Sequence, residues 1–162
     1  MKNLYAPWRY DYILKQKTKG CILCEKYKAN ADNEQLIVKR GKLAYILMNL
    51  YPYNNGHLMI APYRHVAKLV DLTQDELVEI IKLVQLSEKV LQKVYQPDGF
   101  NVGINIGKVA GAGIDSHLHA HIVPRWNGDT NFLATFAETK VISENIEEAY
   151  KKLKHAFERE EA

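Results

Sequence analysis

The pattern of apolar positions predicts two amphipathic helices, of which the longer covers residues 73–95. Apolar side chains recur there at the spacing of a helix face, and they are Leu77, Ile80, Ile81, Val84, Leu91, Val94 and Tyr95. Thr73 and Glu76 match the capping box that starts a helix, and the turn residues 97–99 end it. The second helix is expected to begin at Ser143, with an apolar face of Ile146, Ala149, Tyr150, Leu153 and Phe157.

Shorter apolar runs predict strands on both sides of the long helix. Runs at 34–38 and 43–48 flank Arg40–Gly41 and indicate a hairpin, and residues 57–61 follow an Asn-Asn-Gly turn. Further strands are expected at 100–106 and at 117–123, the last ended by Pro124. Hairpin-joined strands with a helix inserted late favour an α+β fold, here an antiparallel sheet of about five strands with one long inserted helix and a C-terminal helix.

Composition narrows the class of protein without identifying a function. The 162 residues suit a single domain, 1–162, and the net charge of +3 is too small to predict nucleic-acid binding. No apolar run approaches the ~20 residues of a membrane span. The first residues also lack a signal-peptide core. We therefore expect a cytoplasmic protein with no membrane and no nucleic-acid partner.

Half of the six histidines lie in the stretch "SHLHAHIVPRW", at every second position. On a strand, His117, His119 and His121 would share one outward face, while the apolar residues between them face the core. Three open interpretations are ordinary histidines at the core edge, metal ligation, and nucleophilic catalysis by one member. The preceding "GKVAGAG" carries Gly107, Gly111 and Gly113, whose backbone amides could form a phosphate-binding nest or only a turn. Beside such a nest, a neutral imidazole can attack phosphorus.

The segment "HLHAHIV" resembles the signature of the histidine triad family of nucleotidyl hydrolases and transferases. The similarity extends over nearly the whole chain, including "GHLMIAPYRHV" and "VPRWNGDTNF". The latter, with "LYAPWRYDYI", is most similar to the bacterial branch associated with diadenosine tetraphosphate phosphorylase and hydrolase activity. The resemblance implies the histidine-triad fold and a homodimer whose two sheets join.

The same resemblance assigns roles to individual residues. It implies that His119 is the nucleophile, that His121 contacts the α-phosphate, and that His57 lies behind the nucleophile. Asn49 would reach the ribose hydroxyls. The expected phosphate-binding set is Asn105, Gly111, Gly113 and Ser116, with the first triad histidine, His117, also in the catalytic group.

Cys21 and Cys24 are the only cysteines, at a spacing common in zinc sites, although a single C-x-x-C motif also fits a reduced pair in a turn. The family resemblance implies His65 and His117 as the other two ligands. Such a site would be structural and would attach the N-terminal segment 1–30 to the rest of the domain. A substrate-bound divalent cation, Mg or Mn, is a further expectation.

The expected substrate is an adenine dinucleoside polyphosphate, cleaved at the α-phosphate through a nucleotidyl-histidine that passes to water or phosphate. The alternatives are an adenosine phosphoramidate hydrolase and a nucleotide-binding or sensing module with incidental catalysis. Lys108 and Arg125 are candidates to meet polyphosphate charge, and Trp126 to approach a second nucleotide. The aromatic side chains of Tyr5, Trp8, Tyr10 and Tyr12 could stack on adenine, line an interface or anchor the N-terminus.

Overall fold

The computed structural model describes residues 20–129 and 142–160, so the aromatic residues predicted to act near the N-terminus lie outside the described part. Its centre is a five-stranded sheet in the order β1-β2-β3-β5-β4, and every neighbouring pair is antiparallel. The strands are β1 (Ile37–Arg40), β2 (Ala44–Met48), β3 (Leu58–Pro62), β4 (Gly99–Ile104) and β5 (Ala120–Arg125). The predicted α+β fold with an antiparallel five-stranded sheet is confirmed.

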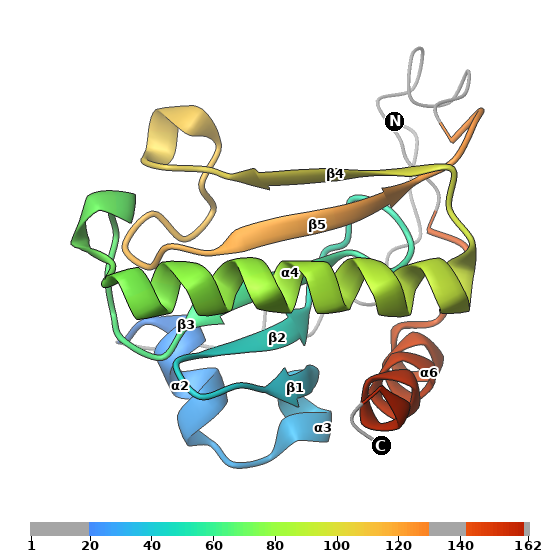
Figure 1. Ribbon diagram of the computed structural model, residues 1–162, viewed down its shortest axis with the longest axis horizontal. Helices are drawn as coiled ribbons and strands as arrows, with labels where there is room; N and C mark the ends of the chain where they lie inside the picture. The colour runs from blue at the N-terminus through green and yellow to red at the C-terminus, as the bar shows by residue number, and fades with distance from the viewer. Residues whose placement is uncertain (1–19, 130–141, 161–162) are drawn as a thin grey trace, which may run out of the picture.

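Two long helices pack together on one face of the sheet (Figure 1). Helix α4 (Gln74–Tyr95) starts with the predicted capping box, in which Thr73 and Glu76 each satisfy the other's backbone N–H. Helix α6 (Ile146–Arg159) is capped by Asn145, whose Oδ1 accepts hydrogen bonds from the amides of Glu147 and Glu148. The predicted start at Ser143 is therefore wrong by two residues.

Short elements complete the described chain. They are the helices α2 (Ile22–Lys28) and α3 (Asp32–Gln35) and the 3₁₀ turns η1 (Leu69–Asp71) and η2 (Lys108–Ala110). The prediction that the first strand starts at residue 34 was wrong, since β1 begins at Ile37. Asp32–Gln35 form α3 instead, and Leu36 takes a left-handed conformation with φ of 59°. The predicted strand 100–106 ends earlier, at Ile104, which leaves Asn105 in the following loop.

The strand that carries the histidine motif begins later than predicted. β5 starts at Ala120 instead of His117, and it continues through Pro124 instead of ending there. Proline is tolerated because β3 pairs with β5 only as far as Ile122, so no ladder hydrogen bond from residue 124 is needed on that side. The Pro124 carbonyl instead accepts a hydrogen bond from the Asn54 side chain.

The two faces of the sheet have separate apolar clusters. The face under α4 and α6 holds the larger cluster, which includes Ile46, Ile60, Ala120 and Ile122. The opposite face packs against Leu23 of α2 and includes Tyr45 and Met59. Because side chains alternate along a strand, His121 lies on the α2 face, between two residues of the α4 face. The histidine site and α4 are therefore on opposite sides of the sheet.

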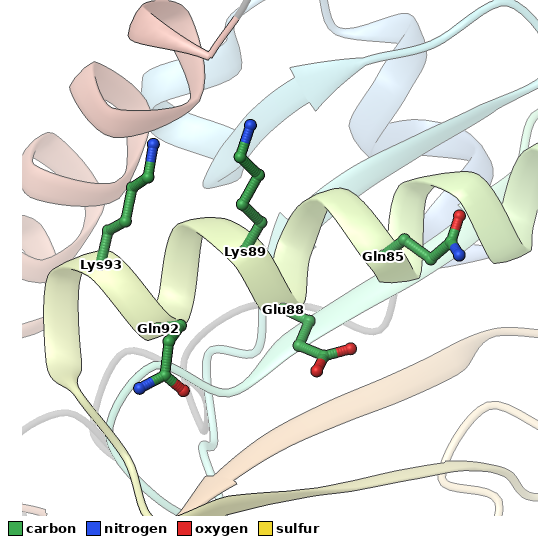
Figure 2. Close-up of a pocket in the computed structure, with 5 residues that line it drawn as sticks. All are labelled: Gln85, Glu88, Lys89, Gln92 and Lys93. Carbon is green, nitrogen blue, oxygen red and sulfur yellow. The ribbon is translucent and has the colours of Figure 1, made fainter.

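The outer surface of α4 carries a shallow hollow lined by Gln85, Glu88, Lys89, Gln92 and Lys93 (Figure 2). Lys89 and Lys93 both form ion pairs with Glu160, just after α6. These two lysines therefore connect the helices. Among the described helices, none has the length and apolar character needed to cross a membrane.

Candidate active site

A pair of hydrogen-bonded histidines, His57 and His121, forms the first half of the site. The Nδ1 atom of His57 lies 3.0 Å from the backbone N of Tyr53 and 3.3 Å from Nδ2 of Asn49. A backbone amide can only donate, so Nδ1 holds the lone pair and Nε2 the proton. His57 Nε2–H then donates to Nδ1 of His121 at 2.9 Å. His121 consequently carries its own proton on Nε2.

His119 has the opposite tautomer. Its Nδ1 lies 2.8 Å from the carbonyl oxygen of His117, and a carbonyl can only accept, so Nδ1 carries the proton. The lone pair of His119 is therefore on Nε2. The rings of His119 and His121 meet edge to face, with centroids 4.8 Å apart. This arrangement places a nucleophilic nitrogen beside an N–H donor, as attack on a phosphate ester requires.

The histidines are buried, which corrects the expectation of an outward-facing row. His57, His119 and His121 are 1%, 4% and 8% exposed. Burial lowers the pKa of His57 to about 3, and the neighbouring His121 and His119 add to this effect. Burial also lowers the pKa of His121 to about 4, with His119 as the second cause. Both side chains are therefore neutral at neutral pH, as the tautomers above require.

The lowered pKa of His57 predicts a pH-dependent loss of stability. In the unfolded chain a histidine titrates near ~6.5, so between that pH and about 3 the unfolded state binds a proton that folded His57 does not. The free energy of unfolding thus decreases as the pH falls through this window, by about 1 kcal/mol per pH unit. Denaturant unfolding between roughly pH 4.5 and 6 should show a shallower pH slope for His57→Gln than for the wild type. Equal slopes would contradict the assignment.

A second cluster lies beside the histidine site. The ligand atoms of Cys21, Cys24, His65 and His117 all lie within 4.8 Å of one another. Nδ1 of His117 is 3.3 Å from Sγ of Cys21, 3.4 Å from Sγ of Cys24 and 3.3 Å from Nδ1 of His65. Two nitrogens bound tetrahedrally to zinc at ~2.0–2.1 Å are separated by about 3.3 Å. The four residues named from the sequence thus lie together at distances that suit a metal.

The hydrogen bond on the far side of His117 also fits metal binding. Its Nε2 lies 2.9 Å from the carbonyl oxygen of Pro62, so Nε2 is protonated and the Nδ1 lone pair points into the cluster. A carbonyl behind a ligand histidine is the usual outer-shell arrangement of zinc sites. Burial, with Cys21 as the next cause, raises the pKa of the Cys24 thiol. A thiolate there needs a cation beside it.

His117 was expected both to catalyse and to bind metal, and in the structure its ring and its backbone carbonyl contact different groups. Both ring nitrogens are engaged away from His119, by the cluster and by Pro62. The backbone carbonyl, in contrast, fixes the tautomer of His119. His117 thus connects the cysteine–histidine cluster, which its ring contacts, with His119, which its backbone carbonyl contacts.

The residues expected to bind nucleotide and phosphate lie in two loops. Asn49 follows β2 and contacts His57, while its Oδ1 accepts from the amide of Tyr51. Asn105 follows β4, and its side-chain amide lies beside Gly111. Gly111 takes a positive φ of 88°. Gly107 also has a positive φ, whereas Gly113 is not among the positive-φ glycines. Gly113 and Ser116 are exposed in the loop before the histidines.

The other charged and aromatic candidates are placed differently. Lys108 is exposed on η2. Arg125 instead donates hydrogen bonds to Asp129 and Asn101, so its guanidinium is already paired. The ring of Trp126 meets Tyr95 edge to face, with centroids 6.4 Å apart.

Sequence reasoning missed Tyr53, Asn54 and Asp129. The Tyr53 ring stacks against the ring of His121 and is tilted against that of His57, and the Tyr53 amide donates to His57. Asn54 is buried and bonded to Asp129. The Asn-Asn-Gly turn was visible in the sequence, but it gave no sign that its first residue turns inward.

The comparisons with known proteins agree with this geometry. A model of the HIT domain matches residues 30–128. The AP-4-A phosphorylase of Mycobacterium tuberculosis is 42% identical over 150 residues, which cover 88% of this chain and 77% of the relative. An asymmetrical bis(5'-nucleosyl)-tetraphosphatase of Schizosaccharomyces pombe is 34% identical over 67% of this chain and 56% of its own length.

Solved structures show the same fold. A zinc-bound histidine triad family protein from Mycobacterium smegmatis aligns with a TM-score of 0.72 at 23% identity, over 88% of this chain and 96% of that chain. The region that the HIT domain model matches, residues 30–128, contains β1 to β5 together with His57, His119 and His121. This chain therefore belongs to the HIT domain family, the histidine triad family that its motif resembles.

Proposed function

We propose that this chain is an enzyme that cleaves dinucleoside polyphosphates of the diadenosine tetraphosphate class at an α-phosphate, through a nucleotidyl-histidine on His119. The observation that carries the proposal is the pair of opposed tautomers, with a lone pair on His119 Nε2 beside an N–H on His121 Nε2. The names of relatives that act on bis-nucleoside tetraphosphates support the substrate class.

The reaction proceeds in two displacements. A bond forms between His119 Nε2 and the α-phosphorus while the bond from that phosphorus to the bridging oxygen breaks, and a nucleoside polyphosphate leaves. His121 Nε2–H donates to a non-bridging oxygen as negative charge develops there. Phosphate or water then attacks the nucleotidyl-histidine and restores the His119 lone pair. His57 keeps its proton on Nε2 throughout and thereby holds His121 in the donor tautomer.

Other residues supply binding. We assign Asn49 to the ribose hydroxyls, and we assign the phosphates to Asn105, Gly111, Gly113 and Ser116. These residues lie in the loops that follow β2 and β4. A divalent cation, Mg or Mn, would neutralise polyphosphate charge if the substrate carries one.

Zinc in the cluster of Cys21, Cys24, His65 and His117 is part of the proposal. Four protein ligands leave no open position, so the metal would be structural. It would attach α2 to the chain before β5 and help residues 1–162 form one domain. We place the protein in the cytoplasm, where thiols stay reduced and available to metal.

A homodimer is also proposed. β4 is an edge strand of the sheet, and its Val102 is 53% exposed. Among the described residues no further strand pairs with this edge, and such an edge is suited to pair with a second copy. The mass of the native particle tests this directly, and the mass of a single chain would contradict it.

Timed incubation with diadenosine tetraphosphate, with and without inorganic phosphate, tests the reaction. ADP plus ATP formed only with phosphate is the phosphorylase result, and AMP plus ATP formed without it is the hydrolase result. We expect one of these two, and His121→Gln should slow it roughly 10²–10³-fold. Turnover of adenosine phosphoramidate alone would transfer the assignment to that substrate class. Turnover of neither substrate would favour the nucleotide-sensing module.

A further inference from the structure

A buried carboxylate beyond the catalytic histidines connects the turn after β5 to the loop that carries His57. The side chain of Asp129 is 8% exposed. Its Oδ2 accepts hydrogen bonds from Arg125 Nε at 2.7 Å and from Asn54 Nδ2 at 2.8 Å, and Oδ1 accepts from the Arg125 guanidinium at 2.8 Å. The backbone amide of Trp126 also donates to Oδ2. We call Asn54, Arg125 and Asp129 the loop clamp.

Asn54 is the member of the loop clamp that lies in the loop that carries His57. It is buried, and the two protons of its amide are both used, one by Asp129 and one by the Pro124 carbonyl at 3.0 Å. Its own backbone carbonyl accepts from the amide of His57 at 3.2 Å. The side chain of Asn54 thus attaches the loop to β5, while its backbone attaches the loop to His57.

The residue before Asn54, Tyr53, carries the amide that fixes the His57 tautomer. Tyr53 N–H donates to His57 Nδ1 at 3.0 Å, and this bond requires the proton on Nε2. A rotation of the Tyr53–Asn54 segment would remove that donor. Nδ1 would then keep only its longer contact with the Asn49 amide, at 3.3 Å, among the donors described above. His57 could hold its proton on Nδ1, and His121 would lose the donor that keeps its proton on Nε2.

We infer that the loop clamp consists of positioning residues, which act through the Tyr53 amide to hold the His57–His121 pair in its single productive tautomer. The inference rests on the proposed function for its effect on catalysis. Its effect on the tautomer, in contrast, follows from the hydrogen bonds alone. Arg125 neutralises the buried Asp129 and extends the clamp to Asn101 on β4.

Two substitutions break the clamp, and a third provides a matched control. Asp129→Asn keeps the size of the side chain but turns one acceptor into a donor that faces Asn54 or Arg125. Asn54→Ala removes the two side-chain N–H groups that bond to Asp129 and to the Pro124 carbonyl. Asp98→Asn makes the same carboxylate-to-amide change at a residue that holds the same turn, through the amide of Asn127. Within the described residues, Asp98 has no recorded hydrogen bond to the loop of His57.

Long-range ¹H–¹⁵N correlation spectra of the histidine rings show which nitrogen carries each proton. In the wild type and in Asp98→Asn we expect His57 protonated on Nε2 alone. In Asp129→Asn and Asn54→Ala we expect a second His57 population protonated on Nδ1, while His119 keeps its Nδ1 proton. The kcat for diadenosine tetraphosphate should fall roughly tenfold or more with little change in KM.

The outcomes separate this inference from the proposed function. An unchanged His57 tautomer in both clamp variants would overturn the inference, as would an equal change in Asp98→Asn. If Asp129→Asn does not fold, Asn54→Ala decides alone. If the tautomer shifts as expected but the wild type does not turn over dinucleoside polyphosphates, the clamp stands and the proposed function is wrong.

Discussion

Replacement of His119 by alanine is expected to reduce turnover of diadenosine tetraphosphate by about 10⁴-fold or more, because no nucleophile remains to form the covalent intermediate. The other two histidines cannot substitute. His57 Nδ1 accepts from the Tyr53 amide, and His121 Nδ1 accepts from His57, so neither presents a free lone pair. Steady-state kinetics with chromatographic separation of the products measures the loss.

His155→Ala is the matched control, since this histidine is exposed on α6, away from the site. It should retain wild-type rates. Residues that act as a unit are not additive in their effects. The double variant His119→Ala with His121→Gln should therefore be hardly slower than His119→Ala alone. Retention of substantial activity by His119→Ala would show that another group attacks phosphorus.

Loss of the metal cluster is the second large expected effect, and it acts on stability. Cys24→Ala should release zinc and lower the free energy of unfolding by several kcal/mol, because metal binding of this kind contributes about 10–16 kcal/mol in small zinc domains. The effect should reach the catalytic histidines, since the His117 ring belongs to the proposed zinc cluster and its backbone carbonyl holds His119. Thermal unfolding and native mass spectrometry measure stability and metal content.

In native mass spectra the wild type should carry one zinc per chain in a particle of two chains. Cys24→Ala should carry none, and His155→Ala should match the wild type in both respects. A wild type purified with zinc in the medium and still free of metal would contradict the zinc assignment. Equal stability of Cys24→Ala and wild type would show that the cluster does not hold the fold together.

The parts of the structure that the sequence predicts are those governed by local chemistry. The capping box at Thr73 and Glu76 depends on residues three apart, and it marks the start of α4 correctly. The spacing of the histidines predicts that His119 and His121 lie near one another, as their rings do. The set of Cys21, Cys24, His65 and His117 came from resemblance to a family, and the fold brings these residues together.

The start of β5 could not be predicted, because it depends on contacts from distant parts of the chain. His117 Nε2 bonds to the Pro62 carbonyl and the Leu118 amide to the Val66 carbonyl, so residues 117–119 follow the chain after β3 instead of a strand ladder.

The loop clamp has no sequence signature either. Asn54 and Asp129 are 75 residues apart, and the group that they position is the backbone amide of Tyr53. Hydrophobic periodicity and motif spacing carry no information about such a bond.

The most direct test of the central claim is a rapid-quench experiment with diadenosine tetraphosphate, stopped in alkali and analysed by mass spectrometry. We expect the intact protein to gain the mass of one adenosine monophosphate group during turnover, and peptide analysis to locate this group on His119. His119→Ala should show no adduct. Product formation without any adduct, or an adduct on another residue, would contradict the account.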